Sequence, residues 1–310
     1  MIKYYTGLLE PHISKKFANH KIIGKNWNII FEKPKRFKNV YDEYEVIIYA
    51  NNKIISQRIL NLVLASLNII EGENIIEPFG LLTFNKNDLK NIKNTRFINT
   101  SKKYISTSNI FNSCILASKA SLKNSLIYSL TKYSLSLTLH YNSLMDLEPY
   151  NEYMSLSKFP KVQLNYAYSI IIAYSGIEDL DLEIKLGSEK QSKINGKWNP
   201  AVKLNLESRL SKSGIDKNKT ILWLIRTTKS NVLKKRKINT VNKTTWAKNR
   251  VRDSEVKIIE AIHYSSWLRS CVASHNFKKE LKSISPYDVS NVQLLLRKLF
   301  LDKVNYKGKY

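Results

Sequence analysis

The chain has 310 residues, of which 43% are apolar and 11% aromatic, so it can bury a core and is not globally disordered. Its 51 Lys and Arg residues outnumber 25 Asp and Glu and give a net charge of +26, which favours an acidic partner such as a nucleic acid. Cys114 and Cys271 predict buried free thiols in a reducing compartment, and no cysteine–histidine cluster with zinc-site spacing predicts a metal or another cofactor.

The first half of the chain predicts a smaller α+β domain over residues 1–150. Two runs rich in aromatic and β-branched residues predict strands at 27–32 and 44–50. Apolar positions at helical spacing predict a helix at 54–70 and one long helix at 109–146. We expect this domain to act as a sensor or to dock a partner.

Targeting signals and membrane spans are not predicted. The N-terminal sequence lacks the apolar region of a signal peptide. The longest aliphatic run, Ile59–Ile70, is too short to span a bilayer. We therefore expect a soluble, cytoplasmic protein without a membrane partner.

A second, helical domain is predicted over residues 155–310, after a polar stretch that contains Pro149 and Pro160. Helical spacing of apolar residues predicts four helices in this domain, at 161–185, 218–228, about 253–274 and from 285 onward. The fold class is thus mainly α, a four-helix bundle preceded by an α+β domain.

Start signals accompany the third and fourth helices. Asp253 or Ser254 is expected to cap the third. Ser285 precedes Pro286 and Asp288, an order typical of a helix start. The apolar side of the first helix is expected to carry Leu164, Tyr168, Ile171, Ile172 and Leu182.

Chemistry is indicated at the end of the third helix, where Arg269 is followed by Ser270 and, five residues later, by His275. A guanidinium can hold a phosphate in a fork, and an imidazole can give and take protons near neutral pH. RNA cleavage needs a base for the 2′-OH proton, a cation for the phosphate and an acid for the leaving oxygen. Residues six apart on one helix are turned by about 240°, so the helix must end between Arg269 and His275, or two protomers must share the site.

The run from Arg269 to His275, the four-helix layout and the terminal helix resemble the HEPN family, over about residues 160–310. The resemblance implies a metal-independent endoribonuclease that acts as a homodimer, with a role as a toxin or in antiviral defence and with an antitoxin or regulatory partner. Ser270 stands where family members commonly carry Asn or Asp. Insertions at 189–217 and 229–252 are also long for a compact bundle.

A basic segment precedes the third helix: residues 217–252 contain 12 Lys or Arg and no acid. Cations with an aromatic residue suit single-stranded RNA, with the cations along the backbone and the ring on a base. The candidate RNA-binding residues of this segment are Lys234, Lys235, Arg236, Lys237, Lys243, Trp246, Lys248, Arg250 and Arg252. The alternatives are a solvated basic loop and a core position for Trp246.

Two other functional classes stay open. The chain could bind RNA without cutting it, or its basic loop could contact an acidic protein. In both cases Arg269 would form an ordinary surface ion pair and His275 would stabilise a helix end, while Ser270 would bond to its own helix backbone. Motifs of P-loop enzymes, dinucleotide enzymes, zincins and serine hydrolases do not occur.

Overall fold

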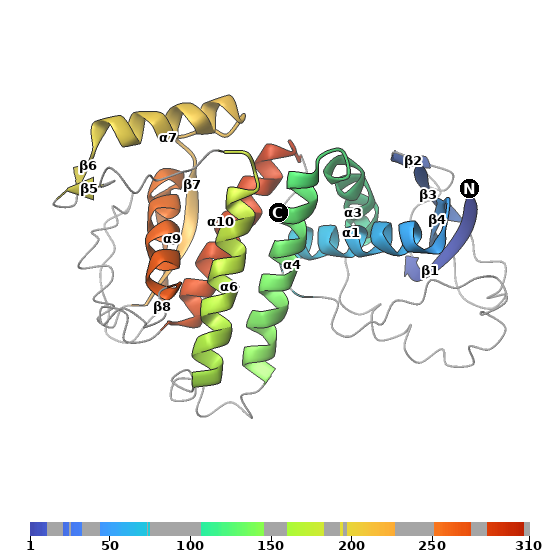
Figure 1. Ribbon diagram of the computed structural model, residues 1–310, viewed down its shortest axis with the longest axis horizontal. Helices are drawn as coiled ribbons and strands as arrows, with labels where there is room; N and C mark the ends of the chain where they lie inside the picture. Colours follow the sequence, from blue (N-terminus) through green and yellow to red (C-terminus); the bar gives the residue numbers. More distant parts are fainter. Residues whose placement is uncertain are drawn as a thin grey trace. The chain divides into compact units, whose positions relative to one another are not determined.

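Figure 1 shows the computed structural model of the chain. It describes residues 1–10, 21–24, 26–32, 44–72, 74, 107–145, 160–182, 193–194, 197–226, 251–273 and 284–306. This part is mostly helical, and a small antiparallel sheet lies near the N-terminus, as the fold class predicts at this level.

Two compact units make up the chain, Met1–Leu130 and Thr131–Tyr306, with the last four residues assigned to the first. The division falls within helix α4 (Asn124–Met145), before the boundary predicted near residue 150. That boundary lies in 146–159, outside the described residues.

The sheet of the first unit has the strand order β1 (Ile2–Glu10), β4 (Tyr44–Ala50), β3 (Trp27–Glu32) and β2 (Lys21–Gly24), with every pair antiparallel. The two predicted strands, β3 and β4, are confirmed and lie at the centre of the sheet. Ile29 and Ile48 face each other across them and are fully buried, which explains their strong signal. The edge strands were not predicted.

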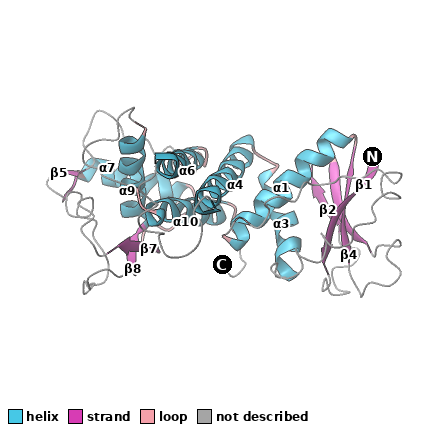
Figure 2. Cartoon of the chain, turned by 90° about the horizontal axis from the view of Figure 1, so that it is seen from below, coloured by secondary structure: helices cyan, strands magenta, loops and turns pink. Residues whose placement is uncertain are grey.

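Helices α1 (Lys53–Glu71) and α3 (Thr107–Ala120) pack on one face of this sheet (Figure 2). The predicted helix at 54–70 is confirmed as α1. It begins where the Asn52 side chain accepts a hydrogen bond from the Ile55 amide, at 2.9 Å. It ends at Gly72, whose φ of 81° suits a residue without a Cβ and whose amide donates to the Asn68 carbonyl.

By length and composition, α1 could cross a membrane. However, 67% of its most apolar window is buried inside the structure. Its apolar residues are therefore those of a helix that packs against the protein's own sheet and α3.

The long helix predicted at 109–146 is wrong as a single element, because α3 ends at Ala120 and α4 starts at Asn124. Between them the chain makes two three-residue turns, from the Leu122 amide to Lys119 and from the Lys123 amide to Ala120. The Ser121 hydroxyl donates to the Ser118 carbonyl, a local bond that competes with helix continuation.

Helix α10 (Pro286–Lys303) is the central helix of the second unit, and α6 (Pro160–Glu178) and α9 (Ile258–Val272) pack against it. The predicted start is confirmed as a capping box, in which Ser285 and Asp288 bond each other's backbone amides. Its predicted apolar residues are all fully buried: Val289, Val292, Leu296, Leu299 and Phe300.

Helix α6 confirms the first predicted helix, but it ends at Glu178 and not at 185, so Leu182 lies beyond it, and it buries a different side. Leu164 and Tyr168 are 47% and 54% exposed, so the predicted stripe is wrong at its first two positions. The buried side is instead formed by Val162, Tyr166, Ile170, Ala173, Tyr174 and Ile177. Apolar and aromatic residues occur on both sides of this helix, so their spacing did not distinguish one side from the other.

The helix predicted at 218–228 is wrong. Residues Thr220–Arg226 form strand β7, which pairs antiparallel with β8 (Val251–Lys257). The side chains of Ile221 and Trp223 are buried, and that of Leu222 between them is exposed. Burial thus alternates with the two-residue period of a strand. The third helix therefore begins at Ile258 as α9, not at Asp253 or Ser254, and it has no side-chain cap.

The edge of β7 away from β8 is covered by a side chain of α10. The Leu224 amide donates to Asn291 Oδ1 at 2.8 Å, and Asn291 Nδ2 donates to the Leu224 carbonyl at 2.9 Å. Asn291 is 1% exposed and thus replaces a third strand at this point.

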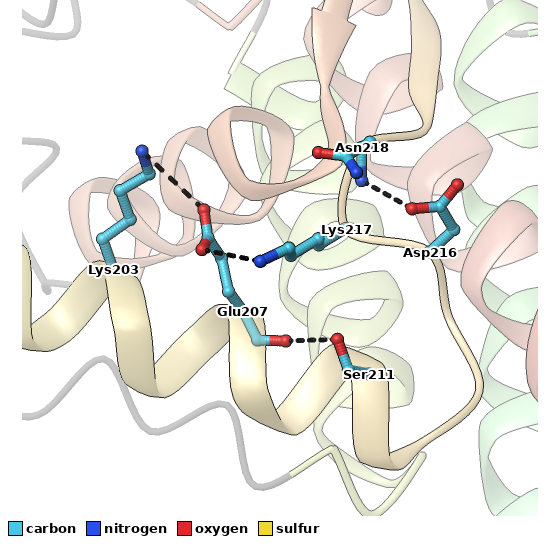
Figure 3. A network of polar contacts seen from close by, with 6 residues as sticks. All are labelled: Lys203, Glu207, Ser211, Asp216, Lys217 and Asn218. Carbon is cyan, nitrogen blue, oxygen red and sulfur yellow. Dashed lines mark hydrogen bonds and ion pairs between the residues drawn. The ribbon is translucent and has the colours of Figure 1, made fainter.

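The 189–217 insertion contains a two-stranded hairpin, β5 (Lys193–Ile194) and β6 (Lys197–Trp198), and helix α7 (Pro200–Lys212). Leu206, Leu210 and Ile215 bury one side of this region. On the solvent side, Glu207 pairs with Lys203 and Lys217 at 3.7 and 3.5 Å, in the network drawn in Figure 3. Such exposed pairs contribute little, so the buried leucines hold α7.

Replacing Asn291 with Ala should lower the free energy of unfolding by about 2 kcal/mol, because two backbone groups of Leu224 lose their partner. Urea denaturation measures this change. Asn205→Ala, at an exposed position of α7, is the control and should stay within about 0.5 kcal/mol of wild type. Equal effects of the two substitutions would contradict the structural role of Asn291.

Candidate functional site

Arg269 is exposed on the last turn of α9. Its guanidinium carbon lies 5.9 Å from the ring centroid of Tyr174, a residue of α6 that is 2% exposed. The ion pairs found within the described ranges do not include Arg269. The aromatic ring thus supports the guanidinium from one side, and its donors remain available to an anion.

The helix ends three residues after Arg269. Helix α9 ends at Val272, and the Ala273 amide donates the last helical bond to the Arg269 carbonyl at 2.9 Å. The end predicted near Ser274 is thus close, and the helix stops between Arg269 and position 275. The rotation of about 240° that a continuous helix would impose between Arg269 and position 275 therefore does not apply. His275 itself lies outside the described residues.

Burial raises the pKa of Tyr174 above its ordinary value. A hydrogen bond with Ser266 and the positive charge of Arg269 lower it, and Glu178 raises it. The phenol therefore stays neutral near pH 7 and acts as a support for Arg269. Because Glu178 influences the pKa of Tyr174, its carboxylate at the end of α6 lies within electrostatic range of this site.

Ser270 is exposed, and its hydroxyl donates to the Trp267 carbonyl at 2.7 Å. This is the alternative in which the serine bonds to its own helix backbone. Since its proton is used there, Ser270 can offer a phosphate no free donor in this conformation.

Most of the predicted RNA-binding residues lie outside the described part of the chain, from Lys234 to Arg250. Arg252 lies in β8, opposite Ile225 of β7. The pairing of Arg226 with Val251 brings the two ends of residues 227–250 side by side. This segment, with eight Lys or Arg and no acid, is thus joined to the core at one place.

A buried polar cluster on the first half of α9 was not predicted. Glu260, on the first turn, pairs with Lys193, and the two side chains are only 5% and 4% exposed. The indole of Trp198 donates to Glu260 at 2.6 Å and packs edge-on against His263, with ring centroids 5.2 Å apart. His263 is 4% exposed, which indicates a structural role.

The sequence contains a signal for this cluster. Asn195 and Gly196 lie between the two short strands, and Asn-Gly is the preferred pair of a two-residue hairpin loop. The hairpin places Lys193 and Trp198 opposite each other, so both reach Glu260. Lys193 and Trp198 compensate the buried negative charge of Glu260, so the cluster holds the hairpin against α9.

A second buried network joins α4, α6 and α10. His140 Nδ1 lies 3.2 Å from Gln293 Oε1, and Gln293 Nε2 donates to Ser136, which in turn donates to the Ser169 carbonyl. His140 Nε2 is buried and has no hydrogen-bond partner among the described residues. Burial lowers the pKa of His140, and the bond to Gln293 opposes this shift.

No group of three or more His, Cys, Asp or Glu side chains in the described ranges is arranged to hold a metal ion. Cys114 and Cys271 are buried free thiols, as predicted. No family model, curated protein or solved structure matches the chain.

Lys193→Met should destabilise the protein by about 3–5 kcal/mol, because Glu260 would remain as an unpaired buried carboxylate. The double variant with Glu260→Gln should recover much of this loss, since the neutral amide still accepts from Trp198. Urea denaturation of both variants measures the coupling. Equal stability of the single and double variants would contradict the buried ion pair.

Stability should fall with acid below about pH 6.5, because the unfolded chain protonates His140 more readily than the folded protein. His140→Asn removes the titrating group and can keep the bond to Gln293. Its free energy of unfolding should therefore depend less on pH between the lowered pKa and the ordinary one. Urea denaturation at several pH values measures this dependence. If the free energy of unfolding changed equally with pH in the variant and the wild type, His140 would not be the cause of the acid destabilisation.

Proposed function

We propose that the protein is a metal-independent endoribonuclease whose centre is formed by Arg269 and His275. The observation that carries this proposal is the end of α9 at Val272, three residues after an exposed arginine that is supported by Tyr174. Such an arginine can bind a phosphate, and because α9 ends before position 275, helix geometry does not turn the side chain of His275 away from it. The resemblance to HEPN nucleases rests on these same residues.

In the proposed reaction, His275 takes the proton of a ribose 2′-OH, and the oxygen attacks the adjacent phosphorus. The bond to the 5′ oxygen breaks, and this oxygen takes a proton from an acid. Arg269 stabilises the negative charge that grows on the phosphate. A histidine with an ordinary pKa near 6.5 suits either proton transfer at neutral pH.

The remaining features follow from the resemblance. The proposed enzyme is a cytoplasmic homodimer with a HEPN-type C-terminal domain and acts as a toxin or in antiviral defence, under the control of an antitoxin or another regulatory partner. The basic residues from Lys234 to Arg252 would hold the RNA. In the HEPN arrangement, α6, α9 and α10 would supply three of the four helices. Residues 218–228, which were predicted to form the remaining helix, contain strand β7 instead.

A non-catalytic RNA-binding protein is the second candidate. The observation that favours it is the pairing of Arg226 with Val251, which ties both ends of the basic segment 227–250 to the core. A segment anchored in this way can bind RNA through its cations without any contribution from Arg269.

Purified protein incubated with labelled single-stranded RNA in EDTA separates the two candidates. Arg269→Ala should lower the cleavage rate by about 10²–10³ and His275→Ala by about 10²–10⁴, because each removes one group that acts in the transition state. Arg209→Ala and His140→Asn are matched controls in the same unit and should cleave normally.

Cleavage that persists in both site variants would exclude this centre. RNA binding that weakens steeply with salt, without cleavage by the wild type, would favour the second candidate.

A further inference from the structure

We propose that a lysine-rich surface at one end of the second unit binds the phosphate backbone of RNA. The surface is formed by four side chains of α7, the turn after it and α10, and we call it the α7–α10 lysine surface: Lys203, Lys217, Lys219 and Lys298. It is separate from Arg269 and from the basic segment 227–250. The proposal rests on RNA as the partner, which both candidate functions share, and it does not depend on cleavage.

The first part of the surface lies on α7 and on the turn that follows this helix. The carboxylate of Glu207 lies 3.7 Å from the ammonium group of Lys203 and 3.5 Å from that of Lys217, as Figure 3 shows. Two ammonium groups thus share one carboxylate. The three side chains together keep one positive charge that no acid among them neutralises.

The second part lies at the end of α10. Asp302 Oδ1 lies 3.2 Å from the ammonium group of Lys219 and 3.7 Å from that of Lys298, so two positive charges again share one carboxylate. A hydrogen bond from the Lys219 amide to the Asp216 carbonyl, at 3.1 Å, closes the turn that carries both Lys217 and Lys219. The two parts of the surface are therefore adjacent.

The ammonium groups of this surface are more exposed than the carboxylates that they share. The side chains of Lys203, Lys217 and Lys219 are 44%, 44% and 42% exposed. Those of Glu207 and Asp302 are only 19% and 6% exposed. A ligand that approaches from the solvent therefore meets positive charge first.

Charge complementarity favours a polyanion as the ligand. Residues 200–219 contain five Lys or Arg and two acids, a net charge of +3. Exposed ion pairs are weak, so the ammonium groups can turn from a carboxylate to a phosphate at little cost. A strand of RNA carries a phosphate at every nucleotide, and two ammonium groups around one carboxylate are close enough to contact neighbouring phosphates. Such contacts hold the strand without selecting its sequence.

The surface lies at the opposite end of α9 from Arg269. The amide of Ile258, the first residue of α9, donates to the Lys219 carbonyl at 3.1 Å. Arg269 follows on the last turn, about 17 Å further along the helix. At about 3.4 Å per nucleotide, a stacked strand needs at least about five nucleotides to reach from one to the other. An RNA that contacts both is therefore longer than the cleaved bond alone requires.

Fluorescence anisotropy with a labelled single-stranded RNA of about 20 nucleotides tests the surface, in a His275→Ala background that keeps the RNA intact. Replacing Lys203, Lys217 and Lys219 together with Gln should weaken binding by at least about tenfold. The slope of log Kd against log salt should fall by about 2, because each lost phosphate contact removes about 0.7. Lys298 stays, so that the nearly buried Asp302 keeps a partner.

Two further variants separate the local charge from the overall charge. The first replaces three exposed lysines that do not belong to the surface with Gln: Lys53, Lys123 and Lys161. It changes the net charge equally and should bind RNA within about twofold of the parent protein, because salt screens distant charges. The second replaces the three surface lysines with Arg, which keeps the charge and should also preserve binding. Circular dichroism checks that each variant is folded.

Equal weakening by the two Gln variants would overturn the proposal, because the overall charge would then explain the binding. An Arg variant that binds as weakly as the Gln variant would also overturn it, since charge would not be the cause. Polyglutamate serves as a model of an acidic protein. If the surface Gln variant lost affinity for polyglutamate but not for RNA, the partner would be an acidic protein and the proposal would be wrong.

Cleavage assays keep this proposal separate from the proposed nuclease. If the wild type does not cut RNA but the surface Gln variant binds RNA more weakly than its control, the surface is supported and the nuclease is opposed. If the wild type cuts RNA and the surface Gln variant binds RNA as tightly as its control, the surface is excluded and the nuclease is not affected.

In a protein that cuts RNA, the surface Gln variant should raise KM for the long RNA and leave kcat unchanged, because the lysines do not contact the cleaved phosphate. For an RNA of about four nucleotides, which cannot reach from Arg269 to the surface, KM should stay the same. An equal rise of KM for both lengths would contradict a second contact.

Discussion

The second unit depends on the burial of α10, and three polar side chains of this helix each bind a different neighbour. Asp288 accepts a hydrogen bond from the Tyr264 hydroxyl of α9 at 2.9 Å. Asn291 covers the edge of β7, and Gln293 joins His140 of α4. Apolar burial supplies most of the stabilisation, but it is not directional. The hydrogen bonds of these three side chains therefore help to determine how the surrounding elements are placed on α10.

Elements with local signals were predictable. The start of α10 was predicted because Ser285, Pro286 and Asp288 act within one turn, and its apolar residues have a clear period. Strand β7 was not, because its short apolar run also fits a buried helix. Residues Thr220–Arg226 form a strand because they pair with β8. Strand β8 follows only after residues 227–250, so this pairing is not local.

The candidate site was predictable in the same uneven way. The sequence places Arg269 on the last turn of a helix, which is correct, but the support from Tyr174 depends on packing between α6 and α9. The apolar stripe of α6 was misassigned because tyrosines fill the core at positions 166 and 174 while Leu164 remains outside. Side-chain identity alone does not indicate which side meets α10. The packing of the whole second unit determines which side of α6 contacts α10.

The pairing of Arg226 with Val251 also has a consequence for the length of the segment between them. Because neighbouring strands hold both ends of residues 227–250, this segment can lengthen or shorten without moving β7 or β8. The entropy of closing a loop grows only slowly, by about 0.6 kcal/mol for each doubling of length. A change in the length of this segment should therefore cost little stability and leave the pairing of β7 with β8 unchanged.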